Sequence, residues 1–287
     1  MSCLLFVPAN SPRMIARAVA SGAAWVILDL EDSVAPADKE AARQGAAEAL
    51  RAHSSAGPRL MVRVNALDSG LIDADLDAVA PYSPSAIMLP KALGGDDAQH
   101  LSVKIAVREA ETGLPDGAIA ILPIVTEVAT ALFRLAGYRG STRRLMGLAW
   151  GAEDLTADLG AQANRLPDGG FTPPFALARN LALFAAASAG VDAVDTVYTR
   201  FRDLEGLRRE CLAARRDGFV AKMAIHPDQV AVINETFTPS PDEIARAQSI
   251  VDAFAARPDA GVLSLDGAMI DRPHLRWAQR TLARRRD

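Results

Sequence analysis

The sequence predicts a (β/α)8 barrel followed by a C-terminal helical extension. Short apolar runs recur along the chain, each as long as a buried strand, and segments with helical spacing separate them. There are eight such runs, at residues 3–7, 25–30, 59–64, 86–90, 118–125, 145–150, 192–197 and 222–225. Alternating strands and helices favour a parallel sheet, and eight units favour closure into a barrel. A doubly wound open sheet is the alternative, but no Gly-x-Gly-x-x-Gly fingerprint follows the first run.

The helices between and after these runs set the domain organisation. Segments rich in Ala, Leu, Glu and Arg with helical spacing lie at residues 38–52, 98–112, 174–189, 241–256 and 272–285. The last two follow the eighth apolar run and exceed what a barrel needs. We therefore expect a barrel domain at residues 1–235 and a helical extension at residues 236–287 that acts as a lid or an oligomer contact.

Composition excludes several classes of function. The chain has 287 residues, of which half are hydrophobic and 23% charged, so it is long enough for one large barrel. A formal net charge of −4 offers no field that would attract nucleic acid or an anionic membrane. Cys3 and Cys211 lie far apart without metal-site spacing, which is typical of a reducing compartment. Because no apolar stretch reaches the roughly 18 residues of a membrane span and no basic region precedes the first run, we expect a soluble cytoplasmic protein.

Polar residues follow nearly every predicted strand. They are Asn10, Glu31, Asp32, Arg63, Asn65, Lys91, Glu127, Asp154, Asp195 and His226. In a barrel, all strand C-termini open on one face, where active sites are built from the loops that follow. The sequence therefore predicts a catalytic site at this face.

Glu127 and Asp154 are the candidate metal ligands. They are 27 positions apart, close to one strand-helix-strand unit of roughly 30 residues, so they can lie at the same end of neighbouring parallel strands. Mg²⁺ is usually held by one or two carboxylates, with water and substrate oxygens completing its octahedron. Helix capping is the alternative, since acidic residues also favour helix N-termini.

Arg63 is the candidate substrate-binding residue. The alternation of its strand places it among barrel-wall positions, where a buried guanidinium needs an anionic partner. An anionic substrate is one partner, and a structural ion pair with Glu31 or Asp32 is the other. The acids Asp29, Glu31 and Asp32 crowd one strand end, where a cation would make them tolerable, and we expect none of them to be a direct metal ligand.

Two further basic residues carry alternative interpretations. Lys91 is the residue that an imine-forming aldolase would use if its pKa were lowered, but the many nearby acids favour a paired, charged lysine. Arg13 follows a Ser-Pro helix start, where positive charge and backbone N–H groups favour phosphate, so it is a candidate for cofactor binding. A plain surface arginine is the other interpretation of Arg13.

The motifs taken together resemble one family. LLFVPANSPRM, VILDLEDSVAPADKEAAR, VRVN, IMLPK, the strand end at Glu127, GAEDL, AKMAIHPDQV and GAMIDRP are similar, in this order, to the citrate lyase β-subunit-like branch of the HpcH/HpaI aldolases. That branch includes malyl-CoA and citramalyl-CoA lyases, and the resemblance runs from about Leu4 to the final helix. The chain departs from many relatives in having Ala9 where they have Gly, and in a compact C-terminal lid.

The resemblance implies a fold, a cofactor and site residues. It implies a (β/α)8 barrel that assembles as a homotrimer or homohexamer, with Mg²⁺ held by Glu127 and Asp154. It also implies that Arg63, together with Glu127, contacts a thioester of coenzyme A or of an acyl carrier protein.

The expected activity is therefore Mg²⁺-dependent cleavage or formation of a carbon-carbon bond in a short 3-hydroxyacyl thioester. The second product or substrate would be a 2-oxo acid such as glyoxylate, pyruvate or oxaloacetate. Two alternatives stay open: a Schiff-base aldolase that uses Lys91, and a subunit that is active only in a multi-subunit complex with an acyl carrier protein.

Asp271 is the candidate proton-transfer residue. Carboxylates that hold a metal are poor proton donors and an arginine stays protonated, yet enolate chemistry needs an acid or base within hydrogen-bond reach. Asp271 follows a Gly-containing stretch at residues 258–267 that could act as a hinge, and it resembles a lid aspartate that relatives contribute to a neighbouring subunit. Asp266 is the competing candidate, and helix capping is the structural alternative for Asp271.

Overall fold

The computed structural model describes residues 2–53 and 57–283, and its chain divides into two compact units. The first unit covers Met1–Asn234 and the second Glu235–Asp287. No helix among the described residues is long and apolar enough to cross a membrane.

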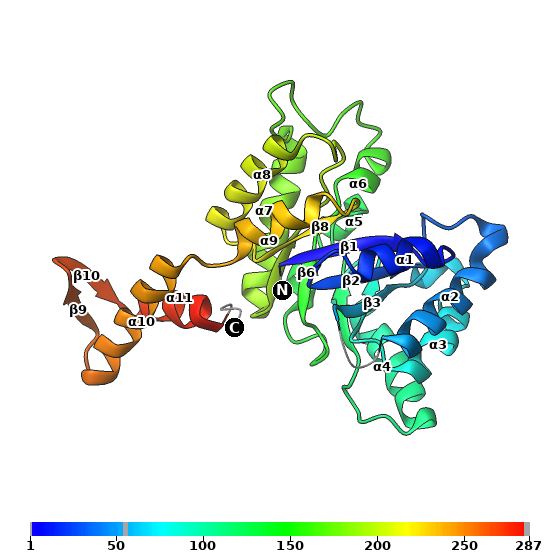
Figure 1. The fold of residues 1–287 in the computed structure, drawn as a ribbon, viewed down its shortest axis with the longest axis horizontal. Coiled ribbons are helices and arrows are strands. Elements are labelled where there is room, and N and C mark those ends of the chain that lie inside the picture. The colour runs from blue at the N-terminus through cyan, green and yellow to red at the C-terminus, as the bar shows by residue number, and fades with distance from the viewer. Residues whose placement is uncertain (1, 54–56, 284–287) are drawn as a thin grey trace. The chain divides into compact units, whose positions relative to one another are not determined.

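The first unit is a barrel of eight parallel strands (Figure 1). The strands are β1 (Cys3–Pro8), β2 (Trp25–Asp29), β3 (Arg59–Arg63), β4 (Ala86–Leu89), β5 (Ala120–Pro123), β6 (Gly147–Ala149), β7 (Asp192–Asp195) and β8 (Ala221–Ala224). Hydrogen bonding runs in the order β5-β4-β3-β2-β1-β8-β7-β6. Two isolated parallel bridges, Ile121 to Leu145 and Ile124 to Ala149, close the ring between β5 and β6. The predicted (β/α)8 barrel is thus confirmed.

Helices cover the outside of the strands. They are α1 (Pro12–Val19), α2 (Lys39–Ala52), α3 (Ile72–Val79), α4 (Gly95–Thr112), α5 (Ala129–Leu132), α6 (Glu153–Asp158), α7 (Pro173–Ala189), α8 (Leu204–Asp217) and α9 (Gln229–Phe237), with 3-10 turns at Pro36–Asp38, Leu67–Ser69, Ala80–Tyr82 and Leu135–Tyr138. In α2 the buried positions Ala42, Ala46, Ala49 and Leu50 recur at helical spacing, so one face packs inward and the other meets water.

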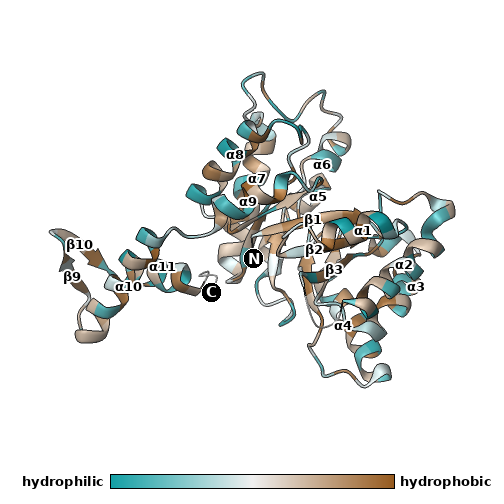
Figure 2. Cartoon of the chain, in the orientation of Figure 1, coloured by the Kyte–Doolittle hydropathy of each residue, from teal (hydrophilic) through white to brown (hydrophobic). Residues whose placement is uncertain are grey.

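The barrel interior is the hydrophobic core. β2 and β4 are buried along their whole length, as strands covered on both faces should be. Inward-facing side chains such as Leu4, Ile27, Met61, Leu122 and Met223 fill the barrel. Figure 2 shows these strands as brown, hydrophobic ribbons, while the surrounding helices also carry hydrophilic positions. A filled interior leaves the strand C-termini as the place for a site.

The second unit has its own small core. It contains α10 (Pro241–Ala256), α11 (Arg272–Ala283) and a hairpin of β9 (Val262–Leu265) with β10 (Ala268–Asp271), which the sequence patterns did not predict. A two-residue Asp-Gly turn with positive φ at both positions joins the strands, the conformation that such hairpins favour. Part of the predicted hinge at residues 258–267 is therefore strand, and the predicted helical residues Arg284 and Arg285 lie outside the described residues.

The apolar face of α10 packs within its own unit. Ala247, Ile250 and Phe254 contact the hairpin and α11 residues that form the unit's core, among them Leu263 and Ile270. A capping box at Ser240 and Glu243 begins this helix. These apolar positions therefore do not by themselves require a neighbouring subunit.

Candidate active site

A cavity of about 380 Å³ opens where the barrel strands end, and residues in or following seven of the eight strands line it. Its floor is the top of the barrel core, formed by Phe6, Ile124, Val197 and Met223. Its polar wall includes Asp29, Arg63, Glu127 and Asp154. The structure thus brings the two predicted metal ligands and the predicted substrate-binding arginine to one cavity.

Glu127 follows β5 and is buried, with only 5% of its surface exposed. Its Oε2 accepts a hydrogen bond of 2.6 Å from the backbone N–H of Lys91. Burial raises the pKa of Glu127 to about 8, a shift that this hydrogen bond opposes and the negative charge of Asp154 increases. A cation bound beside Glu127 would therefore stabilise its ionised form.

Because Gly151 has no side chain, Glu127 can occupy the space beside it. A Cβ at this position would lie 2.7 Å from Cγ of Glu127, closer than real carbon atoms approach. The hydroxyl of Thr126 accepts from the backbone N–H of Gly151 and donates to its carbonyl, both at 3.0 Å. Thr126 therefore ties the end of β5 to the end of β6 and fixes the two acidic segments relative to each other.

Asp154 lies in the first turn of α6, and a third of its side chain is exposed. The N-cap positions of α5 and α6 are Val128 and Ala152, and neither of these residues makes a side-chain capping hydrogen bond. Glu127 and Asp154 thus line the cavity without serving as the caps that the alternative interpretation required.

Arg63 ends β3 and is held by two acids from β2 and the loop after it. Its Nε and Nη2 donate to the two carboxylate oxygens of Asp29 at 2.7 and 2.6 Å. Nη1 lies 3.0 Å from Oε2 of Glu31 as an ion pair without hydrogen-bond geometry. The guanidinium packs on the ring of Phe6, 4.8 Å from its centre. Burial opposes the charge of Arg63, but Asp29 outweighs it and raises the pKa of Arg63, so the side chain is a fixed cation.

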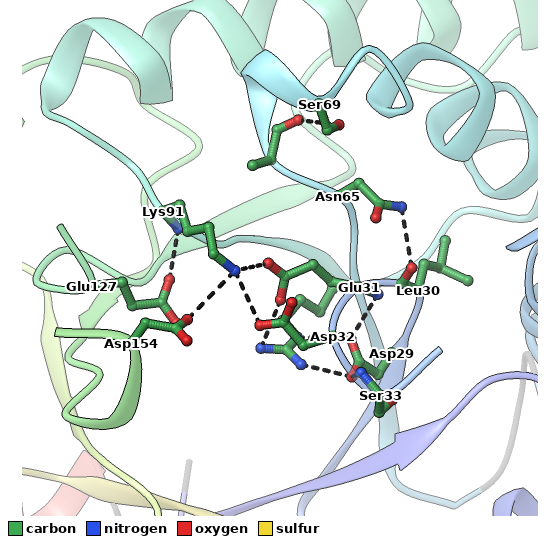
Figure 3. A network of polar contacts seen from close by, with 12 residues as sticks. Asp29, Leu30, Glu31, Asp32, Ser33, Asn65, Ser69, Lys91, Glu127 and Asp154 are labelled. Carbon is green, nitrogen blue, oxygen red and sulfur yellow. Dashed lines mark hydrogen bonds and ion pairs between the residues drawn. The ribbon is translucent and has the colours of Figure 1, made fainter. Parts of the chain in front are cut away.

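Lys91 follows β4 and has a left-handed backbone with φ of 52°. Its Nζ forms ion pairs with Glu31, with Asp32 at 3.0 Å and with Asp154 at 3.4 Å. Burial opposes the charge, but the hydrogen bond to Glu31 outweighs it, and the pKa of Lys91 is raised. The expectation of a paired, charged lysine is therefore met. Figure 3 shows the ammonium group pointing into this group of carboxylates, with Glu127 beside Asp154.

The donor set suits a hard divalent cation. Five carboxylates of the polar network and the exposed Glu153 share the site with two cationic side chains, which leaves an excess of negative charge. Among residues 2–53 and 57–283, no three His, Cys, Asp or Glu side chains form a metal-ligand group. A metal bound by Glu127 and Asp154 would complete its coordination with water and substrate oxygens, which is the usual arrangement for Mg²⁺.

Other polar strand ends have structural roles instead. Asn65 donates to Asp75 and to the backbone carbonyl of Leu30. Asp195 is fully buried, where it accepts from Lys222 and from the indole of Trp150, both at 2.7 Å. These residues hold loops and helices against the barrel, so polarity at a strand end does not by itself indicate a site residue.

Arg13 does not line the cavity, and Asp271 belongs to the second unit. Arg13 is exposed in the first turn of α1, next to Met14, which does line the cavity. Asp271 ends β10 in the second unit, where its Oδ1 is 2.6 Å from Nδ1 of His274. It also accepts a hydrogen bond of 3.4 Å from the backbone N–H of His274, so a capping contact with α11 is present.

Comparisons with known proteins agree with this geometry. The family model described as HpcH/HpaI aldolase/citrate lyase matches residues 2–227, and one described as a carbon-carbon bond lyase of the TIM-barrel fold matches residues 176–286. Citrate lyase subunit beta of Leuconostoc mesenteroides subsp. cremoris is 34% identical over 97% of this chain and 91% of that protein. Mitochondrial citramalyl-CoA lyase of Rattus norvegicus is 33% identical over 96% of this chain and 83% of that protein.

A solved structure is similar over the same length. CitE from Mycobacterium tuberculosis, in complex with magnesium, acetoacetate and coenzyme A, has a TM-score of 0.76 and 33% identity, and the match covers 99% of this chain and 97% of that one. Fold, cavity and these similarities define a TIM-barrel enzyme that acts on carbon-carbon bonds as a lyase. The chain belongs to the HpcH/HpaI aldolase/citrate lyase family.

Proposed function

We propose that the protein is a Mg²⁺-dependent lyase that cleaves, or in reverse forms, a short 3-hydroxyacyl thioester of the malyl, citramalyl or citryl type. The products are an acetyl or acyl thioester and a 2-oxo acid. The observation that carries this proposal is the convergence of Glu127, Asp154 and Arg63 on one cavity at the strand C-termini.

The reaction needs positive partners for two negative charges, one on the acidic end of the substrate and one on the enolate oxygen. The bond between the hydroxyl-bearing carbon and the thioester α-carbon breaks, the hydroxyl proton leaves, and its oxygen becomes the carbonyl of the 2-oxo acid. The electron pair of the broken bond becomes a thioester enolate, whose α-carbon then takes up a proton. An acidic substrate end and an enolate oxygen therefore both require positive partners.

Glu127 and Asp154 would hold the Mg²⁺. When bound, the ion supplies a Lewis acid that lowers the pKa of the substrate hydroxyl and neutralises the acidic end of the substrate. The burial of Glu127 and the charge excess around it support this assignment. Glu127 would also contact the substrate, because its side chain lines the cavity wall.

Arg63 would face the oxygen on which enolate charge develops. A guanidinium has five N–H donors, and Asp29 engages only two of them. Because Asp29 and Phe6 fix its orientation, Arg63 needs no reorganisation as the charge forms, which makes its electrostatic stabilisation effective. The paired, charged state of Lys91 disfavours the alternative imine mechanism, which needs a neutral amine.

Three further parts of the proposal concern groups away from the cavity lining. Arg13, exposed beside the cavity residue Met14, would bind phosphate groups of coenzyme A. Asp271 would transfer the proton that the charged cavity residues cannot, and the protein would assemble as a homotrimer or homohexamer. Sedimentation at micromolar concentration tests the assembly, and a monomer would contradict it.

The decisive experiment assays malyl-, citramalyl- and citryl-CoA with and without chelator. We expect turnover of at least one thioester, loss of that turnover with chelator, and recovery on adding Mg²⁺. Turnover that survives complete metal removal would refute the mechanism.

A matched pair of variants locates the metal. Asp154→Asn should abolish the Mg²⁺-dependent rise in melting temperature without unfolding the barrel. Glu153→Gln removes the same charge one residue away, where the side chain accepts from Asn164, and should keep that rise. Equal Mg²⁺ affinity in both variants would remove Asp154 from the metal site.

The similarity to a citrate lyase subunit keeps a complex-dependent enzyme as the second candidate. Turnover of a CoA thioester by the purified chain alone would exclude it. Turnover only after adding an acyl carrier protein with its partner subunits would establish it.

A further inference from the structure

Thr196 carries a polar group that the described protein leaves without a partner. Its side chain is 1% exposed, and its hydroxyl has no hydrogen-bond partner. Three other buried side-chain groups share this property among the described residues, on Glu31, Arg43 and Tyr138. Of these four residues, Thr196 is the one that lines the cavity.

Apolar residues also line the cavity at the ends of β7 and β8. Thr196 directly follows β7, and the lining residues Val197, Met223 and Ile225 come from β8 or follow these two strands. Thr126 is an internal comparison, because it is equally buried yet makes two hydrogen bonds to Gly151. A buried hydroxyl without a partner destabilises the folded state, so a ligand that supplied an acceptor would recover that loss.

The order of strands around the barrel indicates which part of the substrate lies here. β7 neighbours β6, after which Asp154 lies, whereas Arg63 ends β3 on another part of the ring. A substrate whose acidic end is held at Glu127 and Asp154, with its enolate oxygen toward Arg63, presents its oxo-acid half toward β7.

We propose that Thr196 is a substrate-binding residue whose hydroxyl donates a hydrogen bond to an oxygen of the oxo-acid half of the substrate. This assignment rests on the proposed lyase function. A site that hydrogen-bonds one substrate oxygen discriminates against analogues that lack it, because the buried polar group is then unpaired again. Glyoxylate, pyruvate and oxaloacetate all carry 2-oxo carboxylate oxygens, so this hydrogen bond strengthens the binding of the oxo acid without choosing among the three.

The test uses three variants of the full-length protein. Thr196→Val keeps the shape and removes the hydroxyl, Thr196→Ser keeps the hydroxyl and removes the methyl group, and Thr126→Val removes a hydroxyl that has protein partners. Melting temperature is measured without ligand, and binding of each oxo acid is measured by calorimetry with Mg²⁺. Steady-state assays of the condensation direction give separate KM values for the oxo acid and for acetyl-CoA.

Thr196→Val should melt at the same temperature as wild type or higher, since no protein hydrogen bond is lost. Its affinity for the preferred oxo acid should fall about 10- to 100-fold, the range for one hydrogen bond to a charged acceptor. The KM for acetyl-CoA should stay within about twofold, a change too small for a lost hydrogen bond. Thr196→Ser should keep most of the oxo-acid affinity, and Thr126→Val should lower the melting temperature.

Three results would overturn the assignment. Unchanged oxo-acid affinity in Thr196→Val would mean that the hydroxyl meets only water. A melting temperature lowered as far as in Thr126→Val would mean that it has a protein partner. A loss confined to acetyl-CoA would place it on the other half of the substrate. If wild type itself binds no oxo acid and shows no Mg²⁺-dependent turnover, the proposed function fails and the assignment with it.

Discussion

Replacing Asp29 by Asn should destabilise the barrel and misplace Arg63 at the same time. Asp29 is 1% exposed, and both of its oxygens accept from the Arg63 guanidinium. The same oxygens accept the backbone N–H groups of Glu31 and Ser33 at 3.0 and 3.3 Å. Each oxygen accepts two of these four hydrogen bonds, so in Asp29→Asn the NH₂ group that replaces one oxygen faces two donors.

The expected loss is about 3 kcal/mol. Removing one partner of a buried ion pair costs about 3–5 kcal/mol, and the low end applies because Glu31 stays 3.0 Å from Arg63 and one acceptor oxygen remains. For a unit of this size, about 3 kcal/mol corresponds to a fall of roughly 6–12 °C in melting temperature. Turnover should fall as well, since Arg63 loses the contacts that orient it.

Asp73→Asn is the matched control. Asp73 also pairs with two cations, Lys104 and Arg108, but its side chain is 58% exposed. Exposed pairs contribute about 0–1 kcal/mol, so the melting temperature of this variant should hardly change. Calorimetric melting of wild type and both variants at pH 7 separates the two cases. If Asp29→Asn lowers the melting temperature no more than Asp73→Asn, the buried ion pair of Asp29 with Arg63 does not stabilise the barrel.

The pH dependence gives a second check on Asp29. Burial opposes its ionisation, but Arg63 outweighs it and holds the pKa of Asp29 below its usual 3.8. A lowered folded-state pKa means that the stabilisation is complete above about pH 5 and is lost as pH falls through that pKa. The difference between wild type and Asp29→Asn should therefore be constant from pH 7 to about pH 5 and shrink in more acidic buffer. A difference that grows on acidification would contradict this sign.

Three further outcomes are expected at the site. Gly151→Ala places a methyl group 2.7 Å from Cγ of Glu127, so the Mg²⁺ affinity measured by thermal shift should fall about 10- to 100-fold. Gly261→Ala is the control, because nothing lies within 4 Å of its added carbon, and it should leave the Mg²⁺ affinity unchanged. Borohydride with a 2-oxo acid should give no covalent adduct in mass spectrometry, and an adduct on Lys91 would revive the imine mechanism. Asp271→Asn should lower turnover by about 10²–10⁴ with Mg²⁺ binding intact, and turnover within about threefold of wild type would favour the capping role.

The fold was predictable because its signal is periodic and repeated. The eight apolar runs coincide with β1 to β8, since strands buried on both faces must be apolar along their length. The hairpin of β9 and β10 was missed because half of its strand residues are exposed, so burial imposes little pattern on them. Its Asp-Gly turn at residues 266–267 was the available signal.

From the sequence, the site could be predicted only as a set of strand ends, because neighbouring residues of a strand point in opposite directions. Asp195 and Thr196 are adjacent at the end of β7, yet Asp195 pairs with Lys222 and Thr196 lines the cavity. Alternation along a strand has a period of two, so an uncertainty of one residue in where a strand ends exchanges the two directions. Asp195, the charged residue of this pair, was the predicted candidate, whereas the structure brings the uncharged Thr196 to the cavity.

The division of charge within the site explains why two of its five acids remain for a metal. Asp29 pairs with Arg63, and Glu31 and Asp32 pair with Lys91, so each cation is already engaged by the acids of the β2 end. Lys91 reaches Asp154 only at 3.4 Å, and Glu127 receives a single backbone N–H rather than a side-chain cation. Glu153, a further acid of the cavity wall, is exposed and accepts a hydrogen bond from Asn164. Among the five acids of the polar network, those at the ends of β5 and β6 are therefore the least neutralised. This selection does not depend on the family resemblance, and it identifies the same two residues, Glu127 and Asp154, as the place for a divalent cation.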